Sequence, residues 1–326
     1  MAEQPAPLGA VGGLDTATVH ALRRGKPIVD PWRPLGTSWE EERQPDGSQA
    51  PVLTVFLAGA ECPFGCVFCD LWRHTLDGPT PAGALPAQLA LALEAAGALP
   101  TGCQVKLYNA SNFFAERAVP AADDEPLAVL LAPFAQVIVE CHPRLVGDRC
   151  ARFAARLARG GARLQVAMGL ETVHPAALPR LGKAMTLDDF AAGAERLRTL
   201  GVGVRAFVLV GAPFVPSGEA ALWAERSTAW AFAHGVEHVS LIPVRGEGEA
   251  LRRLAATGDF VPPAPAVVEE AFARCLALGG GGVTLDTWDL DRLFACAACA
   301  PARRARLERM NRRGADEPPV ACERCA

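Results

Sequence analysis

The feature that most constrains this chain is a regular alternation of two kinds of segment across its middle. Short apolar runs rich in β-branched residues predict strands, and the stretches between them have the spacing of helices. The predicted strands are 52–57, 104–109, 136–141, 164–170, 204–210 and 238–243, and the predicted helices are 86–98, 126–134, 144–159, 186–200 and 219–234. The fourth helix is the best marked, because Thr186 and Asp189 have the spacing of a capping box.

Continuous rather than alternating apolar strands are typical of a parallel sheet that is covered on both faces. The sequence therefore predicts a wound or barrel-like α/β fold with its chemistry at the carboxyl ends of the strands.

Composition excludes several classes of protein. The chain has 326 residues, enough to bury a large core without disulfides, and a net charge of −4, which argues against a polycation that coats nucleic acid. No apolar run is long enough to span a membrane, and the first residues lack the basic and apolar regions of a signal peptide, so we expect a cytoplasmic protein without a membrane partner. The 11 cysteines are clustered, and in an unsecreted chain such clusters indicate metal binding rather than disulfides.

Two flanks differ from the repeat and suggest three parts. Residues 1–50 contain several prolines and glycines and no cysteine, and we expect an irregular N-terminal extension that packs across the barrel. Residues 51–290 form the expected barrel, with a late strand-like run at 283–288 after a run of four glycines. Residues 291–326 are expected to form a separate C-terminal module that binds metal through four cysteines.

The first cysteine cluster follows the first predicted strand. Cys62, Cys66 and Cys69 are spaced so that three thiolates can bind three irons of a cubane cluster. No further cysteine follows until Cys103, so the fourth iron is expected to be open to a ligand. The alternatives are three buried thiols or a zinc site with a remote fourth ligand.

These residues resemble the signature of the radical S-adenosylmethionine superfamily, C-x3-C-x2-C with an aromatic residue, here Phe68, before the last cysteine. The resemblance implies a partial (βα)6 TIM-like barrel in which Cys62, Cys66 and Cys69 hold a 4Fe–4S cluster. It further implies that S-adenosylmethionine binds the open iron and is cleaved reductively to a 5′-deoxyadenosyl radical. Such an oxidoreductase-type reaction needs an electron donor such as a flavodoxin or a ferredoxin.

The resemblance also assigns roles at the other strand ends. Asn109 and Ser111 stand where the superfamily receives the methionine amino group, and Glu140 has the E-x-x-P context of a residue that approaches the ribose. Glu171 matches a G-L-E-T stretch, and Lys183 follows where related barrels carry a basic residue. The alternatives are an ordinary polar turn at 109–112 and a structural ion pair between Glu171 and Lys183.

The loop after the cluster carries Trp72, Arg73 and His74. We expect it at the mouth of the site, where these side chains either face a planar or anionic substrate or shield the cluster from solvent.

A second cysteine cluster lies in the tail, where Cys296, Cys299, Cys322 and Cys325 form two C-x2-C pairs. Two C-x2-C pairs favour a tetrahedral zinc site with four thiolate ligands. The alternatives are a second 4Fe–4S cluster or four unmetallated thiols. Residues 301–313 between the pairs contain six arginines and one glutamate, which predicts either a phosphate-binding helix or an ordinary solvated one.

Within the superfamily the chain resembles the Elongator-like branch that includes the radical subunit of archaeosine synthase, through its E-x-H-P and G-L-E-T strand ends and its late cysteine pairs. This resemblance implies modification of a tRNA or RNA nucleoside. Two alternatives stay open: a radical enzyme that acts on a small metabolite or peptide, and a non-enzymatic iron–sulfur or zinc protein that binds nucleic acid.

Overall fold

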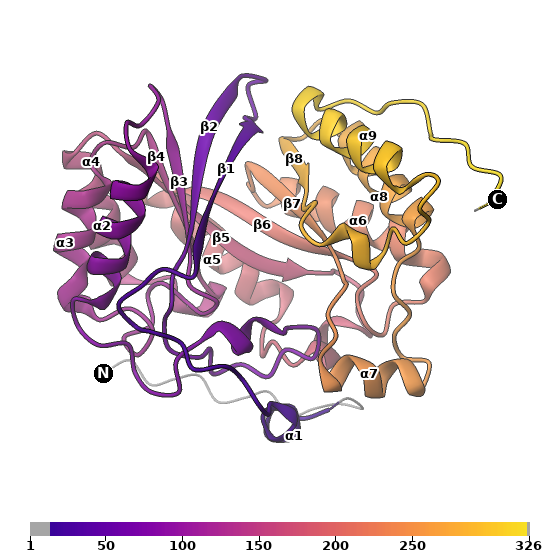
Figure 1. The fold of residues 1–326 in the computed structure, drawn as a ribbon, viewed down its shortest axis with the longest axis horizontal. Coiled ribbons are helices and arrows are strands. Elements are labelled where there is room, and N and C mark those ends of the chain that lie inside the picture. The colour runs from indigo at the N-terminus through magenta and orange to yellow at the C-terminus, as the bar shows by residue number, and fades with distance from the viewer. Residues whose placement is uncertain (1–13, 325–326) are drawn as a thin grey trace.

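A computed structural model describes residues 14–324, and its centre is a single sheet of eight strands in sequence order (Figure 1). β1 runs antiparallel to β2, and every later strand is parallel to the one before it. The strands are β1 Gly36–Arg43, β2 Gln49–Phe56, β3 Gln104–Tyr108, β4 Gln136–Glu140, β5 Arg163–Glu171, β6 Gly203–Val210, β7 His238–Pro243 and β8 Gly282–Leu285. The sheet curves into a nearly closed barrel, in which the rings of Tyr108 on β3 and Phe207 on β6 meet with centroids 6.2 Å apart. The expected barrel-type α/β fold is confirmed.

Helices cover the outside of this sheet. The helices that follow the first parallel strands are α2 Ala84–Ala96, α3 Asp124–Leu131, α4 Asp148–Arg159, α5 Leu187–Thr199 and α6 Ala220–Ala233. Each coincides with a predicted helix to within a few residues. The predicted capping box is present at α5, where the Asp189 N–H donates to Thr186 Oγ1 over 3.1 Å and the Thr186 N–H donates to the Asp189 carboxylate over 2.9 Å.

The flanking segments contribute more to the barrel than the sequence predicted. Within residues 1–50, the segment 36–43 is strand β1 rather than an irregular extension, and it is preceded by the short helix α1 Thr16–Leu22. After β7 come α7 Glu249–Ala256 and α8 Pro265–Ala277. The predicted strand at 283–288 is present as β8 but ends at Leu285, where the Asp286 carboxylate turns the chain by accepting the Trp288 N–H over 2.9 Å. The unpredicted strand β1 and the predicted strand β8 thus extend the six-strand repeat on its two sides.

The last helix, α9 Ala300–Arg313, belongs to the body of the protein and packs against both β1 and β8 (Figure 1). The Asn311 side-chain amide accepts the Leu285 N–H over 2.8 Å and donates to the Leu285 carbonyl over 2.9 Å, so it pairs the open edge of β8. Gln49, at the start of β2, donates to the Arg312 carbonyl over 2.6 Å. Leu307 and Met310 are fully buried in the main core. The helix therefore covers the seam that the sheet leaves between β1 and β8.

The amino-terminal half of the barrel interior holds a buried charge network. Glu42 on β1 accepts from Arg205 on β6, with Nη1 2.9 Å away, and from Lys106 on β3. Arg205 Nε also donates to Gln165 on β5 over 2.9 Å. Burial raises the pKa of Glu42, but Arg205 and then Lys106 outweigh burial and hold it well below its usual range. The network fixes β1 across the barrel and fills the end opposite the candidate site.

None of the helices in residues 14–324 combines the length and the apolar character that crossing a bilayer requires.

Candidate functional site

The loop that carries Cys62, Cys66 and Cys69 leaves the carboxyl end of β2 and is held by a second loop that follows β5. The Val67 N–H donates to the Leu181 carbonyl over 3.0 Å. Gly182 lies so close that a Cβ there would be 2.2 Å from the Gly65 carbonyl oxygen, and its φ of +72° is itself unfavourable for other residues. The two loops therefore form one tightly packed unit.

Residues from the N-terminal segment cover the same loop from the other side. Arg23 donates to the Phe64 carbonyl over 3.0 Å and pairs with Glu61 at 2.7 Å, and Lys26 pairs with Glu61 at 3.1 Å. A Cβ on Gly65 would be 2.7 Å from the Thr16 Cα in α1. The segment expected to pack across the barrel does so at the cysteine loop.

The three thiols lie in surroundings that disfavour free thiolates. Burial raises the pKa of Cys62 to about 11 and that of Cys66 and Cys69 to about 12, although the Lys183 ammonium opposes the rise at Cys62 and Cys66. Coordination to metal would replace these protons. Among residues 14–324, the trio of cysteine sulfurs found within 4.8 Å of one another is in the tail, not here. Three cysteine donors on one loop, beside the Lys183 ammonium, fit the 4Fe–4S cluster that the resemblance implies.

Unpaired polar atoms lie at the carboxyl end of β3. Asn109 is fully buried, and neither its Oδ1 nor its Nδ2 has a hydrogen-bond partner among residues 14–324; the buried Oγ of Ser111 has none there either. Buried polar groups without partners are costly and uncommon, so atoms of this kind indicate a ligand-binding surface. Asn112 differs, because it donates to Cys62 Sγ over 3.4 Å and accepts the His142 N–H over 2.7 Å.

Glu140 ends β4 beside these groups. Burial raises its pKa to about 7, while the Lys183 ammonium and the Asn109 N–H favour the charged form. A carboxyl group whose pKa is raised to near 7, and which forms no ion pair with the described residues, is a marker of a functional site.

Glu171 and Lys183 form a buried ion pair with 2.7 Å between Oε1 and Nζ. Glu171 has a left-handed φ of +65°, at an irregularity in the pairing of β5 with β6. A Cβ on Gly169 would lie 2.0 Å from Glu171 Oε1 and 2.3 Å from Lys183 Nζ, so the glycine is what leaves room for the pair. The ion pair expected as one alternative is present, and the role of both residues in cofactor binding stays a prediction.

His142, which the sequence analysis named only as part of the E-x-H-P pattern, and Phe68 are further neighbours of the site. The His142 ring stacks on Phe64 with centroids 4.2 Å apart, and its Nε2 lies 3.0 Å from the Lys183 carbonyl. Its position directly after Glu140-Cys141 could have marked it as a link between the two loops. Phe68 packs against the core and borders a small cavity beside Cys69.

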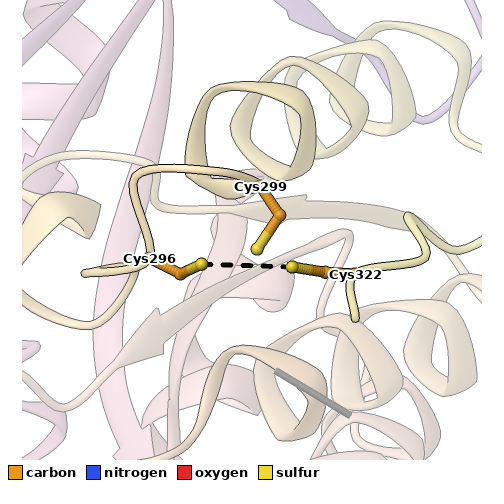
Figure 2. A group of neighbouring side chains, drawn as sticks. All are labelled: Cys296, Cys299 and Cys322. Atoms are coloured by element: carbon orange, nitrogen blue, oxygen red, sulfur yellow. Dashed lines mark hydrogen bonds between the residues drawn. The ribbon is translucent and has the colours of Figure 1, made fainter. Parts of the chain in front are cut away.

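The tail cysteines come together at the start of α9 (Figure 2). The sulfur atoms of Cys296, Cys299 and Cys322 all lie within 4.8 Å of one another, and those of Cys296 and Cys322 are 4.0 Å apart. Cys325 lies outside the described residues. Thiolates that share one zinc ion at about 2.3 Å would be roughly 3.8 Å apart. This trio therefore fits a single metal ion better than the wider spacing of a cubane.

The arginines of α9 are engaged with acidic side chains of this chain. The pairs are Arg303 with Glu269, Arg304 with Asp291, Arg306 with Asp316 at 2.8 Å, Arg309 with Glu317 at 2.9 Å and Arg313 with Glu317 at 2.8 Å. Most of these arginines are thus paired within the chain, and the choice between a phosphate-binding helix and an ordinary solvated one stays a prediction. The helix is fastened to α8 and to the chain that follows it.

Comparison with known proteins places the fold in a class. No family model matches the chain. A solved radical SAM methyltransferase from Sphaerobacter thermophilus is similar over 78% of this chain and 77% of its own, with 17% identity and a TM-score of 0.50. The archaeal Elp3 from Methanocaldococcus infernus, with its N-terminus deleted, aligns over 62% of this chain and 50% of its own, with 14% identity and a TM-score of 0.45. The fold of this chain is thus similar to that of the radical SAM methyltransferase.

The sequence similarity is more particular. Archaeosine synthase subunit beta from Methanosarcina acetivorans is 26% identical over 215 residues, which are 64% of this chain and 62% of that protein. The chain thus spans less than two thirds of the length of this relative. This similarity agrees with the resemblance to the branch that includes an archaeosine synthase subunit.

Proposed function

We propose that this protein is a radical S-adenosylmethionine enzyme that modifies a nucleoside of tRNA or another RNA. The observation that carries the proposal is the presence of three half-buried cysteines and of the unpaired polar atoms of Asn109 and Ser111 at the same end of the barrel. The RNA substrate is supported by the similarity to an archaeosine synthase subunit.

The residues present would divide the work as follows. Cys62, Cys66 and Cys69 would hold the 4Fe–4S cluster, which supplies the electron that cleaves S-adenosylmethionine to a 5′-deoxyadenosyl radical. Lys183 would offset the negative charge of the thiolates, since it lies near enough to influence Cys62 and Cys66. The electron would come from a flavodoxin or a ferredoxin.

The polar groups at the strand ends would bind and orient the cofactor. Asn109 and Ser111 offer a buried amide and a buried hydroxyl to the methionine end. Glu140 offers a carboxylate to the ribose hydroxyls, where a charge-assisted hydrogen bond is worth about 1.5–3 kcal/mol. Glu171 is assigned a supporting role, because its ion pair with Lys183 ties the strand end to the loop behind the cysteines.

We also propose that the tail binds zinc through Cys296, Cys299, Cys322 and Cys325. The close sulfur spacing supports one ion, and the N-terminus of α9 adds a favourable field for thiolates.

The test begins with anaerobic reconstitution, followed by iron and zinc assays and measurement of 5′-deoxyadenosine after reduction with dithionite. We expect four irons and one zinc per chain and formation of 5′-deoxyadenosine. Cys66→Ala should lose the cluster and the cleavage, whereas the control Cys150→Ala, at a buried cysteine of α4, should keep both. Undiminished cleavage of S-adenosylmethionine by Cys66→Ala would contradict the proposal. Eight irons per chain without zinc would show that the tail holds a second 4Fe–4S cluster rather than zinc.

A further inference from the structure

A cavity of about 400 Å³ lies where three separate segments meet at the carboxyl end of the barrel. The segments are the residues around the end of α1, the short helix η1 Leu71–His74 that follows the cysteine loop, and α7. The cavity is bordered by Leu22, Arg24, Trp72, Arg73, Glu249, Arg252 and Arg253, and we name it the arginine groove. Figure 1 shows α1 and α7 at the same end of the molecule.

The arginine groove carries a strong excess of positive charge. Among the described residues that border the groove, Glu249 is the one carboxylate, and it is shared by Arg252 at 3.0 Å and Arg253 at 3.3 Å. Arg24 and Arg73 form no ion pair with the part of the chain that the structure describes; the Arg73 guanidinium lies 5.5 Å from the centroid of the Trp72 ring. Four guanidinium groups thus face one carboxylate, which is the opposite of α9, where acidic partners neutralise the arginines.

The arginine groove also lies next to the cysteine loop that carries Cys62, Cys66 and Cys69. A smaller neighbouring cavity shares Leu22, Trp72 and Glu249 with it and is bordered by Phe68 and Cys69. Trp72, three residues after the last cysteine, is buried and borders both cavities. An anion bound in the groove would therefore be held at the rim of the site.

We propose that the arginine groove binds the phosphodiester backbone of the RNA substrate and positions a nucleoside toward the barrel. Guanidinium groups match phosphate oxygens in geometry and charge. Arg24, Arg252 and Arg253 are exposed. Arg24 follows α1, whereas Arg252 and Arg253 lie in α7, and exposed groups on two separate segments suit successive phosphates of a polymer better than one enclosed phosphate. This inference rests on the proposed RNA substrate. It assigns RNA docking to the arginine groove rather than to α9.

The test measures binding of bulk tRNA over a series of salt concentrations. The double variant Arg252→Gln/Arg253→Gln removes two charges from the groove, and Arg312→Gln/Arg313→Gln removes two from the exposed end of α9 as a matched control. If both groove arginines contact phosphates, the slope of log affinity against log salt should become shallower by roughly 1.4–1.8. We expect tRNA affinity at low salt to fall about tenfold or more in the groove variant. The control should keep the wild-type slope, and iron content should be the same in all three proteins.

Several results would overturn the inference. One is a groove variant that keeps the wild-type salt slope and tRNA affinity. Another is an α9 control that loses as much tRNA affinity as the groove variant. A third is a protein that binds guanosine monophosphate more tightly than tRNA. A wild-type protein that forms 5′-deoxyadenosine but does not bind tRNA would refute the groove while leaving the radical chemistry intact. Groove-dependent tRNA binding without any 5′-deoxyadenosine would instead refute the proposed enzyme.

Discussion

Glu140→Gln should make the cluster-free protein more stable at pH 8, although it removes a group proposed to bind the cofactor. Burial raises the pKa of Glu140 to about 7, from an ordinary value of 4.5. The charged carboxylate is therefore unfavourable in the folded protein, and at about 1.4 kcal/mol per pKa unit its ionisation costs about 3 kcal/mol of stability. Glutamine has nearly the same shape and carries no charge, so it avoids this cost.

The sign and the pH range follow from proton linkage. Below pH 4.5 the carboxyl group is protonated in both states and costs nothing. Between pH 4.5 and 7 the unfolded chain releases the proton while the folded protein keeps it, so stability falls as the pH rises, and above pH 7 the cost is complete. The gain from Glu140→Gln should therefore be about 3 kcal/mol at pH 8 and under about 1 kcal/mol at pH 5.

Urea unfolding at the two pH values measures this difference, and an unchanged m-value would show that the unfolded states are comparable. Isothermal titration of S-adenosylmethionine into the reconstituted protein gives the second readout, where we expect several-fold weaker binding at unchanged iron content. A destabilised variant at pH 8, or the same stability change at both pH values, would refute the buried-charge reasoning. Unchanged cofactor affinity would leave Glu140 a structural residue.

Two further predictions concern the cysteine loop and the tail. Gly182→Ala should destabilise the protein by about 1–3 kcal/mol in urea unfolding and lower its iron content, because the new Cβ would meet the backbone of Gly65 at 2.2 Å and force the cysteine loop to move; retention of full stability and full iron would show that the two loops are not rigidly coupled. Removal of the tail metal by a chelator, or the substitution Cys299→Ser, should lower the melting temperature of the whole protein, since α9 buries Leu307 and Met310 in the main core. A loss of metal with no change in melting temperature would show instead that α9 is held by its ion pairs alone.

The strands and helices of the barrel were predictable because burial on both faces leaves a strong local signal. β4 and β6 are runs of valine and other apolar residues with almost no exposed side chain, and α5 begins with a capping box. The carboxyl-end rule then located Asn109, Ser111 and Glu140 correctly at one end of the sheet. Local pattern and tertiary structure agree in these elements.

β1 was missed because its sequence, Gly-Thr-Ser-Trp-Glu-Glu-Glu-Arg, carries more charge than a strand usually does. Glu42 is buried only because Arg205 and Lys106, more than sixty residues away in the chain, neutralise it inside the barrel. Two arginines of α9 likewise have partners in other elements, Glu269 and Asp291. Charge pairing over long sequence separations leaves no periodic signal.

The placement of α9 over the seam has a consequence for how the chain folds during synthesis. The hydrogen bond from Gln49 to Arg312 joins residues 263 positions apart, so at about 5–20 residues per second the barrel waits tens of seconds after β2 emerges before its seam is covered. The backbone edge of β8 at Leu285 waits a further 26 residues, about 1–5 seconds, for the Asn311 amide that pairs it in the folded protein. An unpaired strand edge is a template for association with other chains. The nascent protein therefore passes through an aggregation-sensitive interval that ends only when one of its last helices leaves the ribosome.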